Sequence, residues 1–472
     1  MCALFAWAAV QETLDIHFWR DRRVLQWDIE AYYHYLPATF IHGDVRELGY
    51  VQALDGELHK SIPSSYGIFH MQETGWDCLK YTCGVALFEA PMFFIAHAYC
   101  LWYCPTQPAD GYSAPYQLAV SVSSILFAFL GLLLLRAFLL RHVSDKASAL
   151  ALIALAFGTN LFFYSTVDSG MSHPYLFFLF AAVLERTDAW HRAPTRAKAV
   201  SLGLALGLIL LTRPIDFVVV LIPIMWTADF GWRAKWALVN KHRAHLLWAS
   251  LTALLPLTLQ FLYWKATTGH FLFYSYRSEG FNWSDPHIID GLFSYRKGWL
   301  VWSPLVALGF IGLTVMLADR SKRALAWPII AFFPPALYGI FSWYQWWYGG
   351  GFGSRGGVGF DLFGDNYNKG RFALVVITLT AGFSLLMWMG EVVTQRGVGN
   401  GMSILIFASV VSRLPANFAT VKAESGFASM IGVALMFVVL MVAIVFVEQG
   451  EQRLLGGRGS GAIQPSPQRV RF

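Results

Sequence analysis

Runs of close to 20 apolar residues recur along the whole chain and constrain its fold more than any other feature. About 20 residues of α-helix are needed to cross a bilayer hydrocarbon core about 30 Å thick. Hydrophobic residues make up 56% of the 472 residues and charged residues 14%, whereas soluble domains have roughly 45–50% apolar and about 25% charged residues. Because the runs recur, they exclude a lone signal peptide or single anchor. We expect an all-α, polytopic helical membrane protein with about 11–12 transmembrane helices.

The expected spanning helices follow these apolar runs. They cover residues 116–139, 148–166, 172–186, 199–212, 215–229, 245–264, 298–317, 324–343, 371–390, 401–414 and 428–447. The chain also begins with ten apolar residues, but Glu12 and Asp15 follow, so we expect a weak or truncated first helix. Residues 83–102 are apolar enough to span, but a span there would reverse the side of every later loop. We therefore expect a helix that lies in the membrane interface.

Lysine and arginine gather in every second linker, and the positive-inside rule places these linkers in the cytoplasm. The clusters are Arg136, Arg141 and Lys146; Arg186, Arg192, Arg196 and Lys198; Arg233, Lys235, Lys241 and Arg243; and Arg320, Lys322 and Arg323. The external segments are then 28–115, 166–172, 213–214, 265–297 and 343–369. The formal net charge is +6, but no continuous basic stripe carries a recognition module, so we expect no nucleic-acid partner. The expected location is the bacterial inner (cytoplasmic) membrane.

The cysteines do not form a recognisable motif. The sequence has Cys2, Cys78, Cys83, Cys100 and Cys104, with no CxxC pair and no zinc-ligand spacing. We expect unpaired buried thiols, with a Cys100–Cys104 disulfide as the alternative. No cofactor and no metal site is evident, although two external acids leave a divalent metal open.

The external segments carry most of the unusual chemistry. Asp28 stands where a first helix would leave the membrane, and Asp168 precedes His173 at the mouth of a later helix. Partial desolvation raises the basicity of a carboxylate, so that an acid at this depth can act as a general base on a hydroxyl. An aromatic belt flanked by solvated acids is the alternative for the stretch around Asp28.

Arg213 interrupts an apolar stretch as Thr212-Arg213-Pro214. A broken helix with an outward guanidinium is suited to hold a phosphate. The alternative is a tight hairpin whose arginine reaches lipid headgroups. Two further external stretches, 269–283 and 343–355, are rich in aromatic, glycine and amide groups that suit sugars and lipid headgroups alike.

The order of these stretches resembles the GT-C superfamily of membrane glycosyltransferases, in particular bacterial relatives of dolichyl-phosphate-mannose-protein mannosyltransferases. The likeness spans roughly residues 20–364 and rests on DIEAYYHYLPATFI, KYTCGVALFEAPMFFIAH, GTNLFFYSTVDSGMSHPYLFF, TRP, GHFLFYSYRSEGFNWSDPH and WWYGGGFGSR. It implies transfer of a sugar from a polyprenyl-phosphate donor to an acceptor hydroxyl on the external face, with inversion. The first helix departs from the family, and nothing after Arg355 continues its later helices.

The same resemblance implies roles for individual residues. Asp28 would be the catalytic base, and Asp168 would be a second catalytic acid that orients the acceptor or a metal. Arg213, Lys265 and Arg355 would hold the donor phosphate, since a phosphate leaving group needs positive charge. The expected substrate-binding residues are Glu30, Tyr33, His173, Tyr276 and Trp347.

The following region, roughly residues 368–453, resembles SecY, the central subunit of the protein-conducting channel. The most specific positions are Gly390, Glu391, Arg396, Gly397, Gly399, Asn400 and Gly401. The resemblance implies the fourth to sixth spanning helices of that family, a cytosolic Gly-Asn-Gly turn and, if the segment is functional, SecE- and SecG-type partners. The expected domains are 1–364, a truncated GT-C-like region; 365–453, a SecY-like segment; and 454–472, a disordered tail rich in glycine, proline, serine and arginine.

Three functions remain open on the sequence. The first is a glycosyltransferase-like protein that uses a polyprenyl-phosphate-linked sugar donor and membrane lipid, fused to a SecY fragment. The second is a SecY-family translocase subunit in protein transport, and the third is an inactive fusion or misassembled gene product. An enzyme requires Asp28, Asp168 and Arg213 to converge on one external site, whereas a channel subunit requires a gate.

Overall fold

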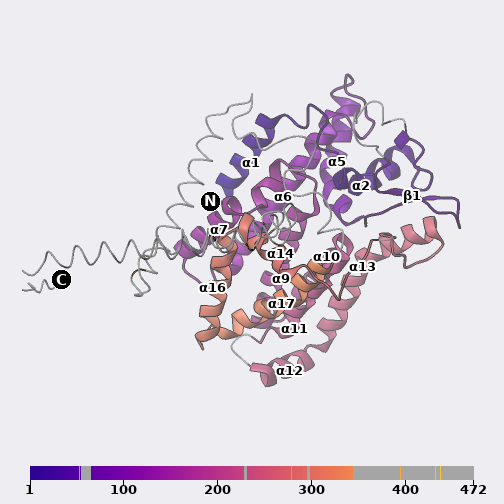
Figure 1. Ribbon diagram of the computed structural model, residues 1–472. Coiled ribbons are helices and arrows are strands. Elements are labelled where there is room, and N and C mark those ends of the chain that lie inside the picture. Colours follow the sequence, from indigo (N-terminus) through magenta and orange to yellow (C-terminus); the bar gives the residue numbers. More distant parts are fainter. Residues whose placement is uncertain are drawn as a thin grey trace, which may run out of the picture. The chain divides into compact units, whose positions relative to one another are not determined.

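The computed structural model describes residues 1–52, 54, 65–227, 231–277, 279–294, 298–320 and 322–343, together with the single residues 394, 431 and 436. The chain divides into two units, Met1–Asn366 and Tyr367–Phe472. All the helices and strands named below belong to the first unit (Figure 1). The expected spans 371–390, 401–414 and 428–447 lie outside the described residues.

The described residues are mostly helical, which confirms the all-α class. The helices are α1 Cys2–Ile16, α2 Asp28–Tyr33, α3 Tyr35–Pro37, α5 Gly84–Trp102, α6 Ala114–Leu139, α7 Asp145–Gly158, α8 Leu161–Thr166, α9 Ser172–Arg192, α10 Arg196–Thr212, α11 Leu221–Met225, α12 Gly231–Lys241, α13 Arg243–Thr268, α14 Ile288–Phe293, α15 Trp299–Trp302, α16 Leu305–Ala318 and α17 Arg323–Ser342. A π-helical turn, η1 Ala38–His42, and a 3-10 helix, η2 Pro214–Val220, complete them. Strands β1 Ile68–His70 and β2 Asp77–Leu79 pair antiparallel, with Phe69 opposite Cys78.

Among the described residues, four helices, α5, α6, α13 and α17, are long and apolar enough to cross a membrane. Three of them correspond to the expected spans 116–139, 245–264 and 324–343. Helix α13 has an apolar face that suits contact with lipid, because Leu247, Leu255 and Leu262 are 60%, 63% and 61% exposed. A continuous apolar face of this kind marks contact with a membrane or a partner. The chain is therefore a multi-pass membrane protein.

Two expected spans are broken, which corrects the sequence-based boundaries. The run 148–166 divides into α7 and α8 because the backbone of Thr159 is extended, and its hydroxyl donates to the Leu155 carbonyl and accepts from the Leu161 N–H. The run 298–317 divides into α15 and α16 at Ser303-Pro304. Proline has no N–H with which to continue the helical ladder.

The first helix was expected to be weak or truncated as a span, and α1, with 15 residues, is shorter than the helices that could cross a membrane, although it continues through Glu12 and Asp15 to Ile16. Its buried face explains this length. Phe5 and Ala9 are fully buried, and Phe5 lies edge-on to Phe162 of α8 with 6.1 Å between the ring centroids. The apolar contacts of its first two turns fix the helix, so two acids near its end do not prevent it from forming.

Both flanks of α5 contact segments that were expected to lie outside the membrane. Lys80, before the helix, pairs with Glu279 at 2.5 Å, and Tyr112, after it, hydrogen-bonds His34 at 2.8 Å. These contacts favour the interfacial helix expected for residues 83–102, although its length and composition also suffice for a span. The interfacial placement stays a prediction.

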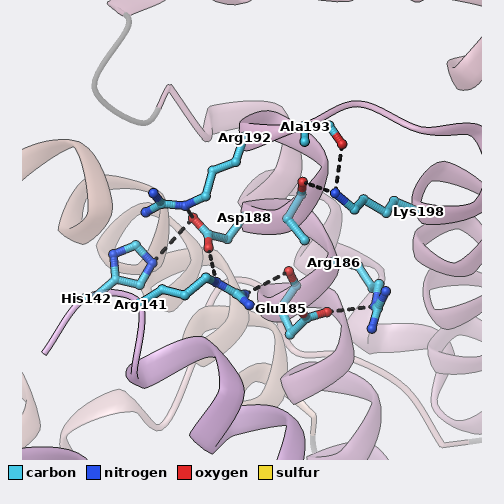
Figure 2. Close-up of polar contacts among 9 residues, drawn as sticks. Arg141, His142, Glu185, Arg186, Asp188, Arg192, Ala193 and Lys198 are labelled. Atoms are coloured by element: carbon cyan, nitrogen blue, oxygen red, sulfur yellow. Dashed lines mark hydrogen bonds and ion pairs between the residues drawn. The ribbon is translucent and has the colours of Figure 1, made fainter. Parts of the chain in front are cut away.

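The basic linkers that follow α6 and α9 come together, as their shared cytoplasmic assignment requires (Figure 2). Arg141 pairs with Glu185 at 3.0 Å and with Asp188 at 2.6 Å. Arg192 and His142 reach the other oxygen of Asp188 at 3.0 and 3.3 Å. Burial acts to raise the pKa of Asp188, but hydrogen bonds from His142, Arg192 and Arg141 outweigh it and lower the pKa to about 2.

The starts of α10 and α13 join the same end of the bundle. Lys198 at the start of α10 donates to the carbonyls of Ala189 and Ala193, which close the C-terminus of α9 (Figure 2). Trp190 donates its indole N–H to His245 of α13 at 3.2 Å. Helices α6, α9, α10 and α13 are thus tied together by the polar residues at their ends.

Candidate functional site

Asp28, the first residue of α2, is held by two phenols. Tyr81 donates to its Oδ1 at 2.7 Å and Tyr66 to the same oxygen at 3.1 Å. The preceding residue, Trp27, has φ of 52°, a conformation that costs free energy for a non-glycine residue and is found most often at functional sites. Among the described residues, no hydrogen bond occupies Oδ2, so one carboxylate oxygen remains available to a ligand.

Aromatic rings surround this carboxylate. Tyr32 lies 4.5 Å from Tyr81, and Tyr276 lies 5.8 Å from Tyr81, measured between ring centroids. Burial, followed by the Asp28 charge, raises the pKa of Tyr66 to about 12. Burial and Asp28 also raise the pKa of Tyr81 well above its usual range. These phenols therefore stay protonated at neutral pH and serve as donors to Asp28.

Lys80 adds a cation beside the tyrosines. Its ammonium group lies 5.3 Å from the Tyr81 ring centroid and 5.4 Å from that of Tyr276, and it pairs with Glu279 at 2.5 Å. Ser275 donates its hydroxyl to the Lys80 carbonyl at 2.5 Å. The segment before α5 is thereby attached to the segment after α13.

Arg213 brings a second cation to this region. Its guanidinium donates to the Ser172 hydroxyl at 2.8 Å. Burial is the largest influence on the pKa of Tyr276 and raises it. The Arg213 charge lowers this pKa and the Asp28 charge raises it, so that the pKa of Tyr276 lies above its usual value. One phenol thus interacts with both Asp28 and Arg213. We call Asp28, Tyr32, Tyr66, Lys80, Tyr81, Ser172, Arg213, Tyr276 and Glu279 the Asp28 cluster.

Asp168 lies on the turn that leads into α9, and His173 is the second residue of that helix. The Asp168 N–H donates to the Phe163 carbonyl at 3.1 Å, and His173 stacks on Tyr164 with 3.8 Å between centroids. The turn ends at Ser172, the partner of Arg213. Asp168 is therefore on the same turn as one member of the Asp28 cluster, and its direct action on an acceptor stays a prediction.

Glu30 and Tyr33 are both buried in the protein core. Glu30 is 2% exposed, and its charge acts on Tyr50 and Tyr112. Tyr33 donates to the Gly111 carbonyl at 2.5 Å. Substrate binding by either residue stays a prediction.

Lys265 lies in the last turn of α13. It donates to the Gly269 carbonyl at 2.6 Å and lies over the Phe271 ring at 5.4 Å. The described contacts do not join it to Arg213, so its role as a phosphate ligand stays a prediction. Trp347, Arg355 and the SecY-like positions from Gly390 to Gly401 lie outside the described residues.

Sequence reasoning missed Lys80, Tyr81, Tyr66 and Glu279. The dipeptide Lys80-Tyr81 opens one of the stretches that carried the GT-C resemblance, and Glu279 lies within another, so the position of these residues was a usable signal. Lys80 and Glu279 carry opposite charges, so they add nothing to a net charge counted along the sequence. Only the fold brings the two side chains together. In the part of the chain that the structure describes, no three His, Cys, Asp or Glu side chains gather in a way that could hold a metal ion.

Comparison with known proteins places a family segment at the end of this multi-pass membrane protein. Residues 322–455 match the family model described as SecY. The match begins at the residue before α17 and extends past Gly399-Asn400-Gly401. The sequence resemblance, set at roughly residues 368–453, thus covers only part of the matched segment.

Curated relatives agree with this match. The chain is 42% identical over 98 residues to the protein translocase subunit SecY of Corynebacterium glutamicum, covering 21% of this chain and 22% of the relative. It is 47% identical over 85 residues to the SecY of Mycobacterium leprae, covering 18% and 19%. It is 46% identical over 84 residues to the SecY of Micrococcus luteus, covering 17% of this chain and 19% of the relative. The chain thus spans about a fifth of the length of the curated relatives it matches. No solved structure matches it significantly, and no match supports the GT-C resemblance.

Proposed function

We propose that this chain acts in protein transport, as a membrane subunit whose residues 322–455 work as a SecY-type segment. The observation that carries the proposal is the match of these residues to the SecY family, together with 42% identity over 98 residues to a SecY translocase subunit. The apolar helices of the described unit support a multi-pass protein, and the relatives support the bacterial inner membrane as its location.

The segment acts in an assembly. Its length corresponds to about a fifth of a SecY chain, so it would border a protein-conducting path together with SecE- and SecG-type partners. Arg396 and the Gly399-Asn400-Gly401 turn would lie on the cytosolic side, where the positive-inside rule places a basic turn. A cationic turn at that position suits contact with a soluble partner that delivers the substrate.

Transport by reconstituted vesicles tests this function. The full chain is inserted into vesicles with SecE- and SecG-type partners, and protease protection of a secretory preprotein is measured. Protection above that of vesicles holding the partners alone supports the proposal, and Arg396→Glu should reduce it. Arg458→Glu, outside the matched residues, is the matched control and should leave it unchanged. Protection equal to that of the partners alone would contradict the proposal.

A second function, group transfer at the external face, is favoured by one observation: the described residues form no hydrogen bond to Asp28 Oδ2, and Arg213 lies close to the same tyrosines. Asp28 would take the proton of an acceptor hydroxyl. The acceptor oxygen would then attack the anomeric carbon of a polyprenyl-phosphate sugar. The bond from that carbon to the phosphate oxygen would break, and Arg213 would stabilise the departing phosphate.

Consumption of a radiolabelled polyprenyl-phosphate sugar by the purified chain tests this second function. Loss of a general base costs about 10²–10⁴-fold in rate, so Asp28→Asn should lower consumption by that factor. Asp145→Asn serves as the matched control, because Asp145 is exposed at the start of α7, where it pairs with Arg136 at 3.4 Å. No consumption by the wild-type chain, or equal consumption by Asp28→Asn, would exclude the transfer.

A further inference from the structure

A buried carboxyl, that of Glu89 in α5, lies next to the turn that joins α8 to α9. The Glu89 side chain is 1% exposed. Tyr175 of α9 donates to its Oε1 at 3.2 Å, whereas Oε2 has no hydrogen-bond partner in the described part of the chain. Glu89 is not a member of the Asp28 cluster, and neither proposed function uses it.

The surroundings of Glu89 favour an uncharged carboxyl. Phe88 stacks on the ring of Tyr175 with 5.4 Å between centroids. The titratable groups that face Glu89 are the phenols of Tyr175 and Tyr33, and no cation among the described residues pairs with it. A buried carboxylate with a single neutral donor is costly, and such a group takes up a proton instead of staying charged.

We propose that Glu89 is a buried proton-binding site, with the proton on Oε2 and Oε1 accepting from Tyr175. The site stands independently of both functions proposed above. It is built from three elements, α5, α6 and α9, and would take a proton from water or from an adjacent carrier without any redox step.

A chain of hydrogen bonds links this proton to the external turn. The Ser124 hydroxyl lies 3.3 Å from the Tyr175 hydroxyl and accepts the Gly170 N–H at 2.8 Å. Gly170 has φ of 93° and lies against Ile29, so the turn has little room to relax. Removal of the proton would draw Tyr175 more strongly to the carboxylate and disturb the bonds that hold this turn.

Infrared spectroscopy of the full chain in lipid vesicles tests the site. At neutral pH the wild-type protein should show the carbonyl band of a protonated carboxyl, and Glu89→Gln should lack it. Glu185→Gln is the matched control, since Glu185 is also buried but pairs with Arg141 and Arg186 and is therefore ionised. A wild-type spectrum without the band, or a band retained in Glu89→Gln, would overturn the proposal.

Tyr175→Phe keeps the test decisive if Glu89→Gln does not fold. This variant keeps the ring and removes the donor to Oε1, so the carbonyl band should shift to the position of a weaker hydrogen bond. An unshifted band overturns the assignment to Glu89. Hydrogen exchange tests the link to the turn: when the pH is raised until the band disappears, protection at residues 166–172, corrected for the intrinsic pH dependence of exchange, should fall. Unchanged protection refutes that link.

Discussion

Tyr81 donates its phenolic hydrogen to Asp28 across 2.7 Å, although 53 positions separate the two residues in the sequence. Three segments meet at this bond, because Tyr81 also contacts the rings of Tyr32 and Tyr276. A charged acceptor makes the bond stronger than one between neutral groups. The bond therefore fixes both the position of Asp28 and the packing of the segment before α5.

Tyr81→Phe should lower the free energy of unfolding by about 2 kcal/mol, the value typical of a hydrogen bond to a charged group. The ring contacts survive this change, so that the loss reports the bond itself. Thermal unfolding in detergent measures it. Tyr103→Phe is the control, because Tyr103 is 78% exposed, and equal melting temperatures for the two variants would contradict the stabilising role of Tyr81.

Gly207→Ala should destabilise the bundle, because a Cβ at this position would collide with the backbone of Ala253 in α13. Small residues let spanning helices approach closely, and overpacking costs about 1–3 kcal/mol. Gly312→Ala in α16 provides the contrast, since an added Cβ there meets nothing within 4 Å. The melting temperature should fall for Gly207→Ala and stay level or rise for Gly312→Ala; the reverse order would show that α10 and α13 do not approach in this way.

Asp188→Asn should cost roughly 3 kcal/mol, as is typical when one partner of a buried ion pair is removed. The effect depends on pH in a defined direction. Because folding lowers the pKa of Asp188 from 3.8 to about 2, its stabilisation is present above pH 3.8 and is lost as the pH falls toward 2. Between pH 3.8 and 2 the free energy of unfolding should depend more steeply on pH for the wild type than for Asp188→Asn. An equal dependence on pH would contradict the ion pairs of Asp188.

His191 should make the protein sensitive to mild acid. Its Nδ1–H donates to the Thr187 carbonyl, and burial lowers its pKa from 6.5 to about 4. The free energy of unfolding is therefore not reduced by His191 above pH 6.5. It falls by roughly 3 kcal/mol as the pH falls toward 4, at about 1.4 kcal/mol per pH unit. His191→Asn keeps a donor but does not titrate, and should lose less stability than the wild type between pH 6.5 and 4.5. An equal loss would assign the acid sensitivity to other groups.

Apolar runs and basic linkers predicted the helical class and the grouping of the linkers. The pairing of Arg141 with Glu185 and Asp188 follows from two linkers that lie on one side of a membrane. The helix breaks at Thr159 and Ser303-Pro304 were not predicted. Hydropathy is averaged over a window of residues, so it carries no information on the backbone angle of a single residue.

The candidate site was predicted in part. Asp28, Arg213 and Tyr276 were chosen for their chemistry, and the fold brings them to the same group of tyrosines. Glu30 follows Asp28 by two positions and is buried, and its part in substrate binding stays a prediction. Lys80 and Glu279 are 199 positions apart, and no local pattern reveals a pair at that separation.

The most direct measurement of a role in protein transport is photo-crosslinking of an arrested secretory preprotein to the full chain in membranes. A photoreactive amino acid is placed at Ser403, inside the residues that match SecY, and at Tyr103 in the first unit as the control. A SecY-type segment that borders the path of the preprotein predicts a crosslink from position 403 and none from position 103. The absence of a crosslink from position 403, and from further positions between 322 and 455, would contradict the proposed function.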